Sequence, residues 1–181
     1  LVNNAGVGVS GDFSARPYED AARQIQLNIT ALVRLTHAAL GRMLGEGRGT
    51  VINVSSVAGD QPGPGNAVYA ATKAFVTNFT EGLAEELRGS GVTVTAVCPG
   101  LTRTEFHDRG GMRPRVRRVP ELAWLRADTV AREALDAAAK GKVVHVNGAA
   151  YKVLSALTGA APRTLRRRAV GVVMARNRSD R

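Results

Sequence analysis

Residues 50–56, TVINVSS, form a short run of β-branched and small side chains between a glycine-rich segment and a loop. A continuous run of this kind is typical of a strand that is buried on both faces. Residues 92–100, VTVTAVCPG, repeat the pattern, and a helix is predicted between the two runs from about Ala67 to Arg88. Strands that alternate with helices of this length indicate an α/β fold with a doubly wound parallel sheet.

The flanking segments continue the alternation. A proline followed by two acidic residues, starting at Pro17, predicts a helix whose apolar positions recur to about Met43. After the second strand we expect a helix near residues 128–140 and a short strand over residues 142–146. Residues 101–127 are rich in arginine and show no clean period.

The composition is that of one globular domain. The 181 residues are 44% hydrophobic and 22% charged. The one cysteine, Cys98, rules out an internal disulfide framework and is compatible with a reducing compartment, so we expect a cytoplasmic location. No apolar run approaches the roughly 20 residues that are needed to span a bilayer.

The net charge of +10 is confined to two segments. Residues 103–118 and 162–181 hold the whole positive excess, and the rest of the chain is neutral. This distribution argues against a domain-wide surface for nucleic acid. The last segment can form a basic amphipathic helix, which either packs as a terminal helix or lies on a membrane surface. Its apolar side would carry Leu165, Ala169, Val172 and Val173.

Small and polar residues follow three predicted strands. They are NNAG at 3–6, NVSS at 53–56 and CPGLT at 98–102. In parallel α/β sheets, ligands bind at the carboxyl ends of the strands. In the helix after the second motif, Tyr69 and Lys73 stand four residues apart and so project from one face. By itself this spacing suits a solvated helix face as well as a site.

These motifs, together with Asn28, YAATK at 69–73 and PGLTRT at 99–104, resemble the short-chain dehydrogenase/reductase family. The resemblance covers residues 1 to about 148 and implies a Rossmann-like catalytic domain. It also implies an NAD(P)-dependent oxidoreductase, which moves a hydride between a nicotinamide cofactor and a carbonyl or alcohol substrate. Residues 149–181 match the family loosely, and we expect them to form a basic, helical tail.

Four catalytic residues are implied by the resemblance. Tyr69 would serve as general acid and base, and the positive charge of Lys73 would favour its phenolate, while the same lysine binds the cofactor ribose. Ser56 would donate a hydrogen bond to the developing oxyanion. Its rival is Ser55, which strand alternation would turn to the opposite face. Asn28 would hold a water chain that leads from the lysine toward solvent.

Cofactor contacts are implied along the same edge of the sheet. The NNAG motif would let backbone approach the adenosine side, and Thr102 would meet the nicotinamide carboxamide, with Thr104 as a weaker candidate. The resemblance leans to NADP over NAD and implies no metal. Phe106 or Met112 would line the substrate pocket. The implied cofactor-binding residues are Asn3, Asn4, Ala5, Gly6, Tyr69, Lys73, Pro99, Gly100 and Thr102.

The glycine-rich phosphate loop of the family has no counterpart in this sequence. The stretch GVGVSG at 6–11 lacks the required glycine spacing. We therefore expect the C-terminal portion of a longer protein, which holds strands four to seven of the family sheet and leaves an apolar edge unpaired. The isolated chain is then expected to bind nicotinamide cofactor poorly and to be inactive.

Substrate, assembly and alternative functions stay open. We expect a moderately apolar ketone, aldehyde or secondary alcohol, and the arginines of residues 103–118 also allow an acidic or carrier-bound substrate. The helices near residues 17–43 and 67–88 would pair copies into homo-dimers or tetramers. The alternative functions are a catalytically silent binding or interaction module and a peripheral membrane or nucleic-acid binder that uses the basic tail.

Overall fold

The computed structural model describes residues 1–109 and 119–160, together with Thr164 and Arg168. At its centre lies a four-stranded sheet in which every pairing is parallel and the order is β1-β2-β3-β6. This arrangement confirms the predicted α/β fold with a parallel sheet. The strands are β1 (Val2–Asn3), β2 (Gly49–Val54), β3 (Val92–Cys98) and β6 (Val144–Val146).

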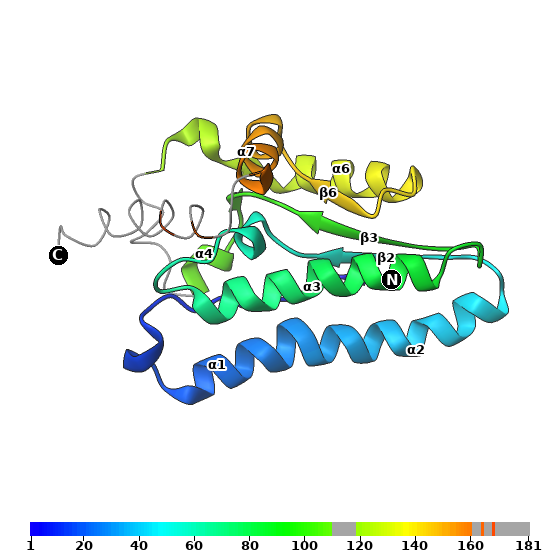
Figure 1. Ribbon diagram of the computed structural model, residues 1–181, viewed down its shortest axis with the longest axis horizontal. Helices are drawn as coiled ribbons and strands as arrows, with labels where there is room; N and C mark the ends of the chain where they lie inside the picture. The colour runs from blue at the N-terminus through cyan, green and yellow to red at the C-terminus, as the bar shows by residue number, and fades with distance from the viewer. Residues whose placement is uncertain (110–118, 161–163, 165–167, 169–181) are drawn as a thin grey trace.

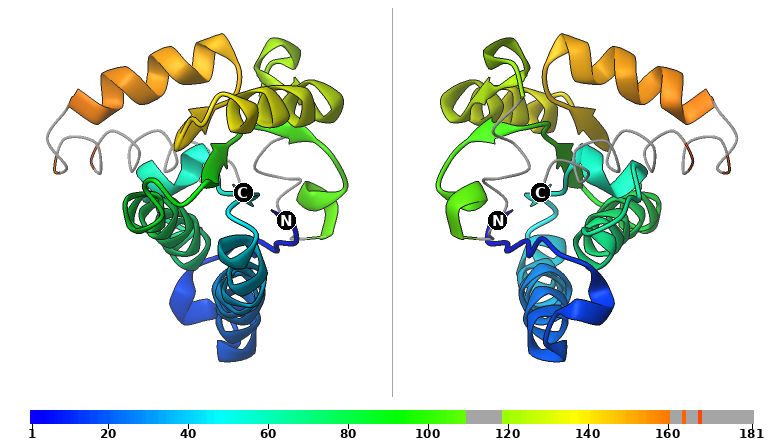
Figure 2. Two further views of the ribbon diagram at one scale, coloured as in Figure 1. Left: turned by 90° about the vertical axis from the view of Figure 1, so that its right-hand side faces the viewer. Right: turned by 90° about the vertical axis from the view of Figure 1, so that its left-hand side faces the viewer.

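Helices cover both faces of this sheet (Figure 1). Figure 2 shows α2 and α3 on one side, with α6 and α7 on the other. Within β2, Val51 packs among residues of α3, whereas its neighbour Ile52 packs against α6 on the opposite face. Alternation along the strand therefore feeds two separate cores. The covering helices are α2 (Leu32–Gly45), α3 (Ala67–Glu86), α6 (Ala127–Ala139) and α7 (Ala149–Ala160).

The predicted helix over residues 17–43 is not continuous. It begins as α1 (Tyr18–Ile25), passes through a π-helical segment (Gln26–Ala31) and continues as α2. The interruption coincides with Asn28, whose buried side chain is hydrogen-bonded to backbone and side-chain groups outside the helix. Single π-turns of this kind occur often at functional sites.

The arginine-rich stretch after β3 contains short elements that the sequence pattern did not reveal. Its strands β4 and β5 pair in parallel as a second, two-stranded sheet, with Thr102 opposite Leu125. The pairing places Arg103 beside Arg126, although the two residues are far apart in the sequence. The elements are β4 (Thr102–Arg103), α4 (Phe106–Arg109), a 3-10 turn (Glu121–Ala123) and β5 (Leu125–Arg126). Two further 3-10 turns cover Phe13–Ala15 and Val57–Asp60.

Within residues 1–109 and 119–160, no helix combines the length and apolarity that a membrane crossing needs. The proposed pocket residue Met112 lies outside the described residues. The same holds for the apolar side of the predicted tail helix, which comprises Leu165, Ala169, Val172 and Val173.

Candidate active site

Tyr69 and Lys73 lie in the first two turns of α3, and both project toward the carboxyl end of β2. The Lys73 side chain is 5% exposed, and its Nζ donates a hydrogen bond of 2.7 Å to the carbonyl oxygen of Val54. Nζ also lies 5.8 Å from the centre of the Tyr69 ring. The two residues thus share one face of the helix, and that face is turned to the sheet.

The two serines after β2 point in different directions. The Ser55 hydroxyl is buried against α3, where it donates to the carbonyl oxygen of Lys73 at 2.8 Å. The Ser56 hydroxyl faces the other way: it donates to the carbonyl oxygen of Pro99 at 3.4 Å and forms a hydrogen bond with Tyr69. The structure therefore brings Ser56, and not Ser55, to the tyrosine hydroxyl.

A glycine permits this approach of Ser56 to α3. The turn that follows Ser56 passes so close to the helix that a Cβ atom at Gly59 would stand 2.9 Å from the backbone nitrogen of Ala74. Backbone can pack against backbone there only because the side chain is missing. The short turn from Ser56 is consequently held against the helix that carries Tyr69 and Lys73.

Asn28 connects the loop after β1 to α3. Its Nδ2 donates to the carbonyl oxygen of Val7 at 2.8 Å and to the hydroxyl of Thr72 at 3.0 Å, and its Oδ1 accepts from the backbone nitrogen of Val7 at 2.9 Å. Thr72 in turn donates to the carbonyl oxygen of Tyr69 at 2.8 Å. At Gly6, a Cβ atom would stand 3.4 Å from both Asn28 Oδ1 and Lys73 Nζ. The asparagine amide and the lysine amine therefore both lie beside Gly6, in the loop after β1.

Burial dominates the ionisation of both central residues. Burial raises the pKa of Tyr69 to about 12, although the hydrogen bond with Ser56 acts in the opposite direction. Burial also lowers the pKa of Lys73 from 10.5 to about 8. Desolvation opposes the charged forms of both groups, and the role of Lys73 in favouring the phenolate stays a prediction. Tyr69 is a neutral phenol near pH 7.

Aromatic side chains from the segment after β3 cover Tyr69. The ring of Phe106 lies 5.6 Å from that of Tyr69, and His107 packs edge-on between Phe106 and Trp124. The guanidinium of Arg103 lies 5.6 Å from the centre of the Trp124 ring. Phe106 thus packs on Tyr69, and its role in lining a substrate pocket stays a prediction.

The implied cofactor residues fall into exposed and interior groups. Asn4 and Ala5 are exposed at the end of β1, and Gly6 is half-buried. Asn3 is buried, and its amide donates to Asn53 Oδ1 at 2.8 Å and to the hydroxyl of Thr36 at 2.9 Å. Its side chain therefore belongs to the interior of the fold, which leaves only its backbone for a ligand.

The segment after β3 continues this edge of the sheet. Pro99 and Gly100 follow the end of β3, and the Thr102 hydroxyl donates to the carbonyl oxygen of Gly100 at 3.1 Å. The hydroxyl of Thr104 accepts from the backbone nitrogen of Phe106 at 3.3 Å, so this side chain serves the start of α4. All of the implied cofactor residues lie at the edge of the sheet where β1, β2 and β3 end.

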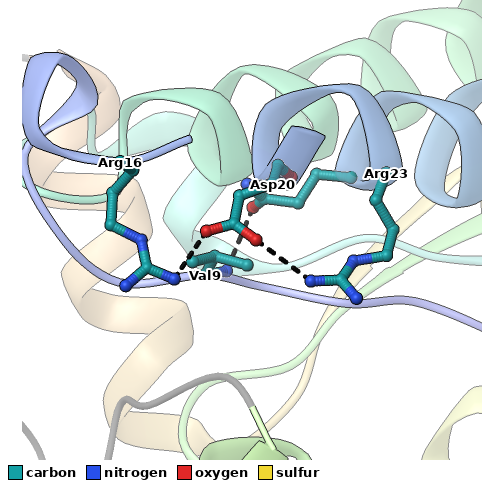
Figure 3. A network of polar contacts seen from close by, with 5 residues as sticks. Val9, Arg16, Asp20 and Arg23 are labelled. Carbon is teal, nitrogen blue, oxygen red and sulfur yellow. Dashed lines mark hydrogen bonds and ion pairs between the residues drawn. The ribbon is translucent and has the colours of Figure 1, made fainter. Parts of the chain in front are cut away.

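A cavity of about 290 Å³ lies beside the start of α3 and is lined in part by Asn66, Val68 and Phe13. An ion-pair arrangement holds its outer wall, because Asp20 accepts from Arg16 at 2.5 Å and from Arg23 at 3.0 Å (Figure 3). Tyr69, Ser56 and Lys73 do not line this cavity, so it is separate from the candidate catalytic residues.

The comparisons with known proteins agree with this geometry. A family model for short chain dehydrogenases matches residues 1–111. The chain belongs to the short-chain dehydrogenase family. This result confirms the resemblance that the motifs indicated.

Two relatives and one solved structure illustrate the breadth of the short-chain dehydrogenases around this chain. Sulfoacetaldehyde reductase 2 of Chromohalobacter salexigens is 44% identical over 112 residues, which are 59% of this chain and 43% of the relative. A 3-oxoacyl-[acyl-carrier-protein] reductase of Synechocystis sp. is 34% identical over 153 residues, which are 84% of this chain and 62% of the relative. This short-chain dehydrogenase therefore spans between about two fifths and three fifths of the length of these relatives.

A solved short-chain dehydrogenase from Sphingobium yanoikuyae, in complex with NADPH, superposes on this chain with a TM-score of 0.77. The two are 38% identical, and the match covers 88% of this chain and 61% of the other. The four-stranded sheet and its covering helices are thus the arrangement of a solved family member.

Two residues of this short-chain dehydrogenase site were missed in the sequence. Thr72 joins Asn28 to the backbone of Tyr69, and Tyr151 contacts the segment after β3 from α7. The position of Thr72 beside Lys73 was a usable signal, since a helix interior seldom favours a hydroxyl without a partner. Nothing local marks Tyr151, because its partners lie 28 and 50 residues away.

Proposed function

We propose that this protein is an NAD(P)-dependent oxidoreductase that moves a hydride between a nicotinamide cofactor and a carbonyl or alcohol substrate. One observation carries the proposal: Tyr69, a half-buried neutral phenol, is hydrogen-bonded to Ser56 and lies one helical turn from the buried amine of Lys73. This arrangement supplies a proton, an oxyanion partner and a nearby cation at one place.

In the direction of reduction, a bound nicotinamide cofactor would provide the hydride that the carbonyl carbon accepts. The substrate oxygen then gains negative charge, and the Ser56 hydroxyl donates a hydrogen bond to it. Tyr69 transfers its proton to that oxygen and becomes a phenolate. The ammonium of Lys73, 5.8 Å from the ring centre, stabilises the phenolate by attraction.

The pKa values favour this direction near neutral pH. A phenol whose pKa burial has raised to about 12 holds its proton until a stronger base forms beside it. An alkoxide is such a base. Lys73, with a pKa lowered to about 8, is able to exchange a proton with solvent and so to restore the phenol. The buried side chain of Asn28 reaches the same place, beside Gly6.

The chain's own residues fit a nicotinamide cofactor at the end of β1. A Cβ atom at Gly6 would lie 3.4 Å from the Lys73 amine, so the missing side chain leaves space beside that amine, where a ribose hydroxyl would meet a donor. Asn4 and Ala5 are exposed beside it. We propose that NNAG, the segment 99–102 and Lys73 hold the cofactor, and that NADP is preferred because the Sphingobium relative binds NADPH.

The substrate would be a small or carrier-bound carbonyl compound with an anionic group. The names of two relatives support this class, since one reduces sulfoacetaldehyde and one a 3-oxoacyl thioester. Arg103 is exposed near the aromatic cover of Tyr69, which also favours an anion.

The first test measures, by absorbance, how fast the full-length protein oxidises NADPH. The substrates are sulfoacetaldehyde, a 3-oxoacyl thioester and a neutral ketone, each in a separate assay. Turnover of sulfoacetaldehyde or of the 3-oxoacyl thioester supports the proposal, and turnover of the neutral ketone alone would contradict the substrate class. Failure with all three, together with failure to bind NADPH in a titration, would contradict the oxidoreductase proposal itself.

Assembly into homo-dimers or tetramers through α2 and α3 is part of the proposal. Exposed apolar side chains on these helices, such as Leu35, Leu44 and Phe75, support it. Light scattering of the wild type and of Leu35→Glu would test it. Contact of the tail at residues 162–181 with an anionic membrane stays a prediction, and vesicle co-sedimentation of a tail-deleted variant would test it.

A further inference from the structure

Tyr151, in the first turn of α7, joins two segments that are distant in sequence. Its hydroxyl accepts a hydrogen bond from the backbone nitrogen of Leu101 at 3.2 Å and donates one to the carbonyl oxygen of Ala123 at 2.8 Å. The backbone nitrogen of Leu125 donates to the carbonyl oxygen of Leu101 at 2.8 Å, beside the same place. One phenol therefore fixes both ends of the segment between β4 and β5.

The ring of Tyr151, like its hydroxyl, is held by contacts with the segment after β3. It packs directly on Gly100, where any Cβ atom would collide with the ring. The ring is oriented by α7, which begins after Gly148, a residue with φ of 80° that glycine adopts without strain. Tyr151 therefore covers the backbone of residues 100 and 101 from the side of α7.

Both ends of the segment 99–106 reach the candidate catalytic residues. At one end, the carbonyl oxygen of Pro99 accepts from the hydroxyl of Ser56 and from the backbone nitrogen of Val57. At the other end, the ring of Phe106 packs on Tyr69. A shift of this backbone would therefore change the partner of the serine hydroxyl and the burial of the tyrosine together.

We propose that Tyr151 is a positioning residue for the reaction, which holds the segment 99–106 so that Ser56 and Tyr69 are correctly placed. This inference rests on the proposed oxidoreductase function. Tyr151 contacts neither Ser56 nor Tyr69. It acts on them by holding the backbone of Leu101.

The test compares Tyr151→Phe with Tyr18→Phe in the full-length protein. Both changes remove one phenol hydroxyl, but the side chain of Tyr18 is 73% exposed. In Tyr151→Phe we expect kcat/KM for the carbonyl substrate to fall about tenfold, because both hydrogen bonds that hold the segment are lost. We also expect the pH at half-maximal alcohol oxidation to decrease, since a looser Phe106 leaves Tyr69 better hydrated. Tyr18→Phe should change neither quantity.

A spectroscopic measurement separates positioning from a general loss of folding. Trp124, the one tryptophan in this sequence, follows the carbonyl that Tyr151 binds. Its fluorine NMR signal in fluorotryptophan-labelled protein, assigned by its loss in Trp124→Phe, should shift in Tyr151→Phe while far-UV circular dichroism is unchanged. An active wild type whose turnover, pH profile and Trp124 signal are all unaltered by Tyr151→Phe would overturn the inference. An inactive wild type would instead overturn the proposed function.

Discussion

At Tyr69 the ring and the hydroxyl have separate tasks. The ring packs with Phe106, and the hydroxyl meets Ser56. Tyr69→Phe should therefore lower kcat by at least about 100-fold, the usual scale of general acid catalysis, while the Kd for NADPH stays within about twofold. Stopped-flow turnover and fluorescence titration measure the two quantities. Tyr18→Phe is the matched control, and a Tyr69→Phe variant with a tenth of wild-type kcat would contradict the assigned role.

Lys73 illustrates a conflict between stability and function. Because its folded pKa of about 8 lies below the unfolded value near 10.5, the unfolded chain binds more protons between these values. Stability therefore rises with pH through this window, and the buried charge is most costly below about pH 8. Lys73→Met lacks this titration. From about pH 7 to about pH 9.5, the wild type should gain about 2 kcal/mol relative to the variant.

Urea unfolding at the two pH values checks this prediction. A difference between Lys73→Met and the wild type that is the same at both values would contradict it, because it would show that Lys73 has an ordinary pKa in the folded state. The variant should also lose turnover, since the cation beside Tyr69 is gone.

The π-helical segment between α1 and α2 contains one buried polar side chain, that of Asn28. Asn28 is 1% exposed and makes three hydrogen bonds, two to Val7 and one to Thr72. Asn28→Ala leaves these partners buried and unpaired, so the free energy of unfolding should fall by about 2 to 4 kcal/mol. The amide of Val7 should also exchange its hydrogen faster. Asn78→Ala, at an exposed asparagine of α3, is the control and should change stability by less than about 0.5 kcal/mol.

At the scale of elements, the sequence predicted what a repeating pattern encodes. Strands β2 and β3 and helix α3 were expected within a few residues of their bounds, since their apolar residues recur with the period of the element. The π-helical segment and the β4–β5 pair have no such period. Both depend on partners far away in the chain, such as Val7 for Asn28 and Leu125 for Thr102.

Across the whole molecule, a buried polar chain ties the sheet to the helices on one face. Asn3 of β1 donates to Asn53 of β2, whose amide donates in turn to the hydroxyl of Thr80 in α3 at 2.9 Å. Asn53→Ala breaks the chain at its centre and should lower the free energy of unfolding by about 2 to 3 kcal/mol. Asn4→Ala, at the exposed neighbour, should have little effect. Equal losses in urea unfolding would show that the chain contributes nothing.

The sequence motifs identified the residues of the candidate site, but they did not predict the pKa values of those residues. The motifs placed Ser56, Tyr69 and Lys73 on neighbouring elements, and the fold brings them together. Whether the lysine activates the phenol depends on how much water reaches them, and side chains such as Phe106 decide that. Desolvation is a property of the packed molecule, so a motif cannot express it.

The parallel pairing of β4 with β5 makes residues 103 and 126 neighbours in space. The 21 residues from 104 to 124 can therefore be exchanged as one unit, because β4 and β5, which close the loop, lie outside the part that would be replaced. Grafting the corresponding stretch from a relative that keeps Phe106 should change the preferred carbonyl compound without moving the unfolding midpoint. Relatives of this protein can then differ in substrate through changes in this one segment, while the four-stranded sheet stays the same.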